Sequence, residues 1–476
     1  MPKPSRPAVH PRRRTLLRWS LLPASGVVGW SGLAGAADTP NSPERAEPPR
    51  LALLIGNRAY PGGEDLPPIH KNVRDLATAL QKRGFTVTDG LDLELPAARG
   101  LVASFVARVN AAPADAIVFF YFSGHGAQVD SENLLVSSNV NPKARPDVLM
   151  KGSMTLTKDV IGQLPLRPAG LTIAVIDACR TSLKSSLDSD GLNQVEAPPG
   201  CLIAFATGAG KPAIAPNDDT RNTFYTASLV KVMGAASDEI SFSDLFRLVK
   251  TDTQQTMLNH PVALLRQFAQ FPFIAENTQV RRRLAPRVAN APPPPPANAP
   301  PPLSAKEDEA VAWKRLEAQL WPVDVLSTAE DYLKSYPDSP LLGSAQVARD
   351  GAAEAVAILR RSNVRLYRSA FQALADLPPE RAADILKAGR GDKDAAARLG
   401  RHYKRTADGS AANRSGGDSR YEGWMQYAAA LGNGIASYDL SLYYRRVEQP
   451  QLASEYETRA RSLGYTPPPS LDNSRK

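Results

Sequence analysis

A histidine and a cysteine each stand just beyond an apolar run of the sequence. His125 follows residues 116–122, and Cys179 follows residues 171–176. Apolar runs of this length predict buried strands, and side chains just past such strands can meet a substrate. A cysteine thiolate attacks carbonyl carbons, while a nearby imidazole takes the thiol proton and later protonates the leaving amine. Singly, the two residues could be a structural histidine and a small core cysteine; together they predict acyl-transfer chemistry.

Glycines flank the histidine as Gly124 and Gly126. Because glycine has no side chain, a substrate carbonyl can approach the backbone closely there. A backbone N–H at this place can stabilise the negative charge that develops on the carbonyl oxygen during attack. The segment therefore predicts a place for an oxyanion as well as a base.

The elements that must position these residues alternate between apolar runs and helical patterns. Val73, Leu76 and Leu80 share one face of a predicted helix, and Ser241 with Asp244 predicts a helix start. The predicted strands are 51–55, 85–88, 116–122, 171–176, 201–206 and 271–275. Strands that alternate with helices indicate a mostly parallel sheet covered on both faces, an α/β fold. Pro272 suits an edge position for the last strand.

The second half of the chain is separated from the first by a proline-rich segment. Residues 279–304 predict a semi-rigid linker, with an SH3-type ligand as the alternative. The linker divides a domain at 47–278 from one at 305–476. We expect few contacts between the halves, so that residues 37–284 fold and react alone.

Residues 305–476 are alanine-rich and show inexact internal repeats. The pattern Ala395, Leu399 and Tyr403 recurs 41 positions later. Trp424 and Ala428 are matched 32 positions later by Tyr456 and Ala460. Periods of this size predict stacked helical hairpins, an all-α repeat domain. They resemble Sel-like tetratricopeptide repeats; a plain helical bundle is the alternative.

The first 36 residues read as an export leader. Arg13 and Arg14 precede a short apolar stretch that ends at Ala36 in a small-x-small pattern. This arrangement resembles a twin-arginine signal, which predicts export of the folded protein to a bacterial periplasm or beyond; a disordered basic tail is the alternative. The net charge of +9 falls to +3 without the six Lys/Arg of this segment, so nucleic-acid binding is not expected. We expect no stable membrane span after cleavage.

Residues 51–275 resemble the caspase-like cysteine peptidases, in their metacaspase and prokaryotic branch. The separation of 54 residues between His125 and Cys179 is close to the caspase spacing of about 50. The matching motifs are Leu53–Asn57 with Tyr60, Tyr121–Gly126, Asp177–Arg180, Gly200–Thr207 and Arg221-Asn222. The resemblance implies a caspase-haemoglobinase fold and peptide hydrolysis through a Cys–His dyad.

The resemblance also implies individual roles. Cys179 would be the nucleophile and His125 its partner, with the N–H groups of Gly126 and Cys179 binding the oxyanion. Asn72 occupies a position where the family commonly has an aspartate of the substrate pocket. The segment after Arg180 departs from the family pattern as well.

Asp177 lies two residues before Cys179, so both side chains project to the same side if the strand persists. A carboxylate beside the nucleophile favours a basic side chain at the scissile bond and repels an acidic one. We therefore expect cleavage after Arg or Lys, with Asn72 supplying an uncharged acceptor. The alternative is that Asp177 is buried and bonded to backbone N–H groups.

The remaining candidates have weaker patterns. Cys201 begins a predicted strand and is interpreted as a core residue. Asp188, Asp190 and Glu196 lie in one acidic loop that could hold calcium; a solvated loop is the alternative, and no other metal or cofactor is expected. His70 could line the cleft or lie in a surface loop.

The sequence thus predicts a cysteine-type endopeptidase that acts on a protein or peptide, with the helical repeats recruiting substrate or a protein partner. One alternative is a non-catalytic scaffold that keeps the fold. Another is a different acyl-transfer enzyme on the same dyad, such as a transpeptidase.

Overall fold

The computed structural model describes residues 47–129, 132–178, 181–182, 195–208, 213–285, 308–374, 377–407 and 414–465. The predicted leader, Cys179, Asp188 and Asp190 lie outside these residues, as does most of the proline-rich linker.

A six-stranded sheet forms the centre of the first half, in the order β10-β9-β7-β3-β1-β2. All neighbours are parallel except β10, which runs antiparallel to β9. This confirms the predicted α/β fold and the edge position of the last strand. The strands are β1 (Arg50–Gly56), β2 (Thr86–Leu91), β3 (Ile117–Gly124), β7 (Leu171–Ala178), β9 (Cys201–Phe205) and β10 (Phe273–Asn277).

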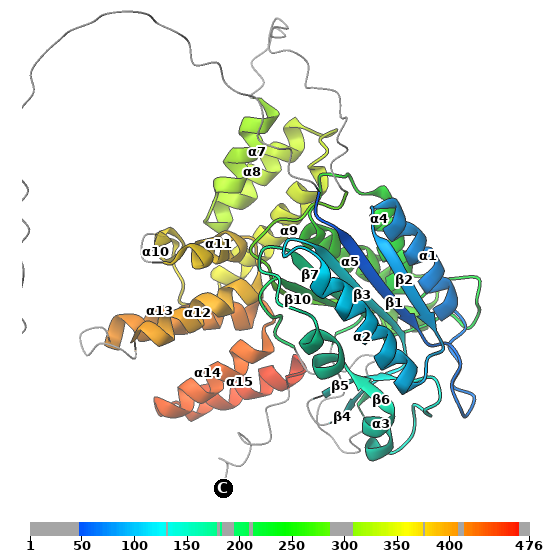
Figure 1. Cartoon of the computed structure of the whole chain (residues 1–476). Coiled ribbons are helices and arrows are strands. Elements are labelled where there is room, and N and C mark those ends of the chain that lie inside the picture. The colour runs from blue at the N-terminus through cyan, green and yellow to red at the C-terminus, as the bar shows by residue number, and fades with distance from the viewer. Residues whose placement is uncertain are drawn as a thin grey trace, which may run out of the picture. The chain divides into compact units, whose positions relative to one another are not determined.

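Helices cover both faces of this sheet because its central strands are apolar on both sides. Alternate residues of each strand enter two separate cores. Leu54, Tyr121 and Val175 pack beneath α1 (Ile69–Lys82), α4 (Phe224–Ala235) and α5 (Phe242–Leu258). Leu53, Phe120 and Ile176 pack on the other side, beneath α2 (Leu95–Ala111) and the short helical segments Leu156–Val160 and Ile161–Gln163 (Figure 1).

A second, smaller sheet extends from the end of β3. Its order is β6-β5-β4-β8, and α3 (Pro146–Gly152) packs beside it. Its strands are β4 (Gly126–Val129), β5 (Glu132–Val136), β6 (Ser153–Thr155) and β8 (Thr181–Ser182). β4 pairs in parallel with β8, with Ala127 opposite Thr181. The segments that follow His125 and Cys179 therefore run side by side.

The packed part of the first half continues to Ala285, beyond the predicted boundary at residue 278. After α6 (Ala263–Gln267) and β10, Leu284 is fully buried in the core under α5. Arg50 Nη1 donates to the Leu284 carbonyl over 2.6 Å. The segment at Arg283 and Leu284 is held in place because its carbonyl oxygens accept hydrogen bonds from the buried Arg50 guanidinium.

The second half is entirely helical in its described residues. Its helices are α7 (Glu309–Ala318), α8 (Pro322–Ser335), α9 (Leu342–Leu359), α10 (Arg368–Gln372), α11 (Pro379–Ala388), α12 (Lys393–Ala407), α13 (Arg414–Ala430), α14 (Gly434–Arg446) and α15 (Pro450–Ser462). The repeated positions coincide with two helix pairs, α12 with α13 and α14 with α15. Gly432 and Gly464 follow α13 and α15 with φ of 95° and 77°, a backbone that favours glycine. No helix in the described part of the chain is long and apolar enough to cross a bilayer.

The expectation of few contacts between the halves is wrong. Arg247 of α5 pairs with Asp392 over 3.0 Å, and Lys387 of α11 reaches Glu276 of β10 over 3.1 Å. A proline-rich linker shows where the chain leaves one domain; it says nothing about whether the next domain docks back.

Candidate active site

The register of β3 and β7 brings the two predicted catalytic positions to the same edge of the sheet. Ser123 lies opposite Asp177, and Gly124 lies opposite Ala178. His125 and Cys179 are each the next residue along their strand, although Cys179 itself lies outside the described residues. The parallel pairing of β4 with β8 continues the same alignment beyond the two positions.

The imidazole of His125 is held in one tautomer. Its Nε2 lies 2.8 Å from the carbonyl oxygen of Glu64. Since a carbonyl oxygen only accepts hydrogen bonds, Nε2 carries the hydrogen. In the neutral ring Nδ1 is then the basic nitrogen, able to take a proton from a neighbouring group.

The surroundings of His125 keep that ring neutral. Burial is the main effect on the group and lowers its pKa below the ordinary 6.5, although the Glu64 hydrogen bond acts in the opposite direction. The ring packs edge-on against Tyr60, with 4.7 Å between centroids. The Tyr60 hydroxyl accepts the His125 backbone N–H over 3.0 Å. A Cβ on Gly124 would approach that hydroxyl to 2.6 Å, which explains the glycine before the histidine.

Asp177 is buried and bonded to hydroxyl groups rather than to backbone N–H groups. Its Oδ2 accepts hydrogen bonds from Thr223 and, over 2.6 Å, from Thr226. Tyr121 approaches the same oxygen to 3.5 Å. Its other oxygen, Oδ1, is buried and has no hydrogen-bond partner among the described residues. Burial raises the pKa of this carboxyl above its ordinary 3.8, and the hydroxyl groups oppose that rise.

Asn72 lies in the same cluster, on α1, and is fully buried. Its Nδ2 donates to Thr223 Oγ1 over 3.0 Å and to Ser123 Oγ over 3.2 Å. Its Oδ1 accepts the Thr223 backbone N–H over 3.1 Å. Asn72 and Asp177 are thus brought together through Thr223, the residue that caps α4. Both ends of the Asn72 amide are used in holding Thr223.

The other predicted residues are distributed as follows. Gly126 is the buried first residue of β4. Cys201 is confirmed as a core residue: it pairs with Thr172 at the opposite end of the sheet, and burial raises its pKa to about 11. His70 lies on α1 rather than in a loop, with Nε2 2.8 Å from Asp92.

Of the three acidic residues in the predicted calcium loop, Glu196 is the one that lies among the described residues. It forms an ion pair of 2.6 Å with Arg401. Within the described ranges no group of three His, Cys, Asp or Glu side chains could hold a metal ion.

Sequence reasoning missed three contributors to this site. The Glu64 carbonyl fixes the histidine tautomer, and Thr223 and Thr226 provide the hydroxyls around Asp177. A backbone carbonyl has no side-chain signal in a sequence. The two threonines carry only a weak signal, as a helix cap and the residue one turn further on.

Residues 49–282 match the family model for the caspase domain. This part of the chain is a caspase domain. A comparison with curated proteins gave no match. Among solved structures, caspase-1 from Spodoptera frugiperda is 16% identical, with 53% of this chain and 97% of that chain covered and a TM-score of 0.39. The described strand ends of the caspase domain carry His125, Gly126 and Asp177, three of the residues predicted for its site.

Proposed function

We propose that the caspase domain is a cysteine-type endopeptidase in which Cys179 is the nucleophile and His125 the proton carrier. The observation that carries the proposal is the fixed tautomer of His125 at a strand end in register with the strand that leads to Cys179. Nδ1 takes the thiol proton as the sulfur bonds to the scissile carbonyl carbon. The C–N bond then breaks, and the proton passes to the leaving amine. Water hydrolyses the thioester, releases the acid and restores the thiol.

The backbone N–H groups of Gly126 and Cys179 bind the oxyanion in this proposal. No cofactor is needed, because thiolate and imidazole supply both the nucleophile and the proton transfer. A calcium requirement through the loop of Asp188, Asp190 and Glu196 would appear as loss of activity in a chelator and recovery with calcium alone.

Cleavage after Arg or Lys is the proposed specificity. Asp177 supports it, because one oxygen of this buried carboxylate has no partner among the described residues, and such a group is costly unless a cation reaches it. No Lys or Arg of the described residues contacts this carboxylate. Asn72 acts indirectly in this proposal, by fixing Thr223, which donates to Asp177.

An active-site thiol probe on the purified full chain tests the nucleophile. Labelling should be lost in Cys179→Ala and kept in Cys201→Ala, which is the matched cysteine control. Loss in the Cys201 variant alone, or labelling of neither residue, would favour a non-catalytic caspase-fold scaffold. Mass spectrometry of the products in the presence of an added amine separates hydrolysis from transpeptidation.

The proposed setting is a bacterial periplasm, reached through the twin-arginine-like leader. The support is the order Arg13-Arg14, short apolar stretch and Ala36. Arg13→Lys with Arg14→Lys should leave the protein in the cytoplasmic fraction, whereas Arg6→Lys with Arg12→Lys should not.

We also propose that the helical repeats recruit substrate or a protein partner. A pocket between the segment that follows α9 and the helices α13, α14 and α15, lined by Arg365, Gln426 and Tyr456 among others, supports a binding role. Its volume is about 240 Å³. Arg365→Ala should reduce cleavage of the protein substrate while leaving cleavage of a short fluorogenic peptide unchanged.

A further inference from the structure

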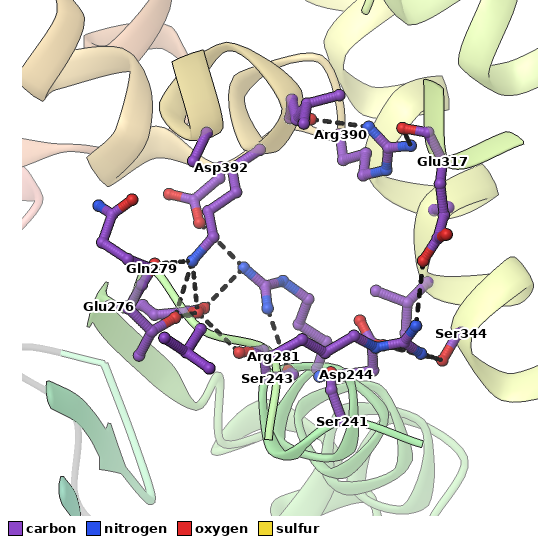
Figure 2. A pocket seen from close by; sticks show the side chains of 18 of the residues that line it. Ser241, Ser243, Asp244, Glu276, Gln279, Arg281, Glu317, Ser344, Arg390 and Asp392 are labelled. Carbon is purple, nitrogen blue, oxygen red and sulfur yellow. Dashed lines mark hydrogen bonds and ion pairs between the residues drawn. The ribbon is translucent and has the colours of Figure 1, made fainter. Parts of the chain in front are cut away.

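A pocket of about 460 Å³ lies where the helical domain meets the caspase domain (Figure 2). Its walls come from α5, from the segment that follows β10, and from the helices α7, α9 and α11. A volume of this size is typical of sites that hold small ligands. His125, Asn72 and Asp177 are not among its lining residues, so the pocket is separate from the candidate active site.

Much of the lining is apolar and belongs to the helical domain. Trp313, Leu316, Val347, Ala348 and Leu386 contribute to it. These side chains come from three helices, α7, α9 and α11. A ligand whose apolar part displaces water from this wall is held there by the hydrophobic effect.

Three of the four cations in the lining pair with carboxylates. The pairs are Arg247 with Glu276 and with Asp392, Lys387 with Glu276, and Arg281 with Glu317, at 2.9, 3.0, 3.1 and 3.2 Å. The remaining acid, Asp244, accepts from the Ser344 hydroxyl over 2.8 Å and lies 3.9 Å from Arg281. Because each acid of the lining already has a cation or a donor beside it, the pocket offers little to a cationic ligand.

Arg390 is the fourth cation, and it pairs with no carboxylate of the described residues. Its Nη1 donates to the carbonyl oxygens of Leu386 over 2.8 Å and Gln319 over 3.1 Å. Its Nη2 donates to those of Leu316 over 2.8 Å and Glu317 over 3.3 Å. Three of these carbonyls end α7, and a helix end supplies only a partial negative charge. Burial lowers the pKa of this guanidinium despite the opposing charges of two lining acids.

We propose that the pocket binds a small carboxylate that carries an apolar chain or ring. Its carboxylate pairs with Arg390, because a partly buried cation with neutral partners is stabilised by an anion. Its apolar part packs on Trp313 and Val347. One unmatched guanidinium fits a single negative charge, whereas a phosphate dianion would need a second free cation. This inference is independent of the proposed peptidase activity.

The proposed ligand would connect the two domains. Figure 2 shows Arg390, from the helical domain, on the side of the pocket opposite Asp244 and Arg281 of the caspase domain. Because both domains are needed to form the walls, a bound ligand favours the docked arrangement over a separated one.

Calorimetry on the purified full chain with octanoate, octanol and octylammonium tests the ligand class, since these probes share one chain and differ in head group. Octanoate should bind about tenfold more tightly than octanol or better, because it adds a charge-assisted hydrogen bond. Octylammonium should bind more weakly than octanol. Saturating octanoate should slow hydrogen exchange both in residues 278–281 and in α11, which places the probe in this pocket.

Val347→Phe fills the pocket without changing a charge and should remove detectable octanoate binding. Val323→Phe makes the same enlargement at an exposed position of α8; it is the matched control and should keep that binding. Arg390→Gln keeps N–H donors for the carbonyl groups but loses the charge, so it should remove the preference for octanoate over octanol.

Equal binding of the three probes, no binding of octanoate, or octanoate binding that survives Val347→Phe would overturn the proposal. Retention of the octanoate preference in Arg390→Gln would overturn it as well. Should a variant lose its near-ultraviolet circular dichroism, the order of the three probes on the wild type and the site of exchange protection decide the matter.

Discussion

His125 and Asp177 show how neighbouring atoms decide what a residue can do. The Glu64 carbonyl fixes the proton of His125 on Nε2, which leaves Nδ1 as the base. The hydroxyls of Thr223 and Thr226 donate to one oxygen of Asp177, and the other oxygen has no hydrogen-bond partner among the described residues. These surroundings support the proposed roles, proton transfer for His125 and recognition of a basic side chain for Asp177.

Replacement of His125 by alanine should abolish most turnover. Without a proton carrier, kcat/KM for a fluorogenic peptide should fall by about 10²- to 10⁴-fold. The fold should survive, because the ring is only partly buried at a strand end; urea unfolding should show a loss near 1 kcal/mol. His70→Ala is the matched control and should keep its activity. A large loss of stability with activity retained would identify His125 as a structural residue.

Asp177→Asn should separate stability from specificity. Because the folded state raises the pKa of this carboxyl, it binds the proton more tightly than the unfolded chain does. The stability that this group contributes is full below the ordinary pKa of 3.8 and is lost as pH rises through the folded value. At pH 7 the variant should therefore melt at the wild-type temperature or above, while its preference for Arg and Lys in a peptide library disappears.

The same carboxyl predicts a pH effect on the wild type. The preference for Arg peptides over neutral peptides should weaken as pH falls and Asp177 becomes protonated. Because the pKa of Asp177 is raised, this loss should begin at a higher pH than for an ordinary aspartate. Asp252→Asn, at an exposed ion pair, should leave the library profile unchanged. Retention of the basic preference in Asp177→Asn would remove Asp177 from the pocket.

At the scale of elements, β10 is where the sheet meets the helical domain. Burial alone would raise the pKa of Glu276, but Lys387 and Arg247 hold it well below the ordinary 4.5. A group with a depressed pKa stabilises the fold above its unfolded pKa, and this stability is lost as pH falls through the folded value. The strand is thus fixed by charge on its outer side and by packing on its inner side.

Glu276→Gln should destabilise the protein at pH 7 by about 3 kcal/mol, because Arg247 and Lys387 lose their buried counter-charge. Urea unfolding measures the difference, which should narrow as pH falls below 4.5, because the unfolded wild type then binds a proton that folded Glu276 does not. Glu239→Gln removes a more exposed ion pair with Arg283 and should cost under about 1 kcal/mol. Equal effects of the two substitutions would contradict the buried network.

At the scale of the molecule, the helical domain contributes contacts to the edge of the caspase domain's sheet, in addition to its proposed role in recruitment. It supplies Lys387, Lys393, Asp394 and Arg398 to one edge strand. A chain that ends before the linker lacks all four.

A chain of residues 37–285 should melt at least about 5 °C below the full protein, since several charge-assisted hydrogen bonds are missing. Circular dichroism at low salt measures the shift. The matched control is the full protein cut within residues 286–307, in which both halves remain present; it should melt close to the intact chain. Identical melting of the truncated and full proteins would restore the expectation that the halves are independent.

The sequence by itself predicted the six strands of the central sheet, their mostly parallel direction and the place of His125 after a strand, because buried strands and the glycines around the histidine leave local signals. The order of those strands and the second sheet were found only in the structure. It also predicted that Cys201 belongs to the core, since Cys201 begins a strand whereas Cys179 follows the end of one. The two residues therefore belong to opposite ends of the parallel strands. Only the tertiary structure decided the tautomer of His125, the hydroxyl environment of Asp177 and the docking of α12 on β10. Those features depend on backbone carbonyls and on side chains more than 40 residues apart, such as Asp177 with Thr223, and no local pattern encodes such meetings.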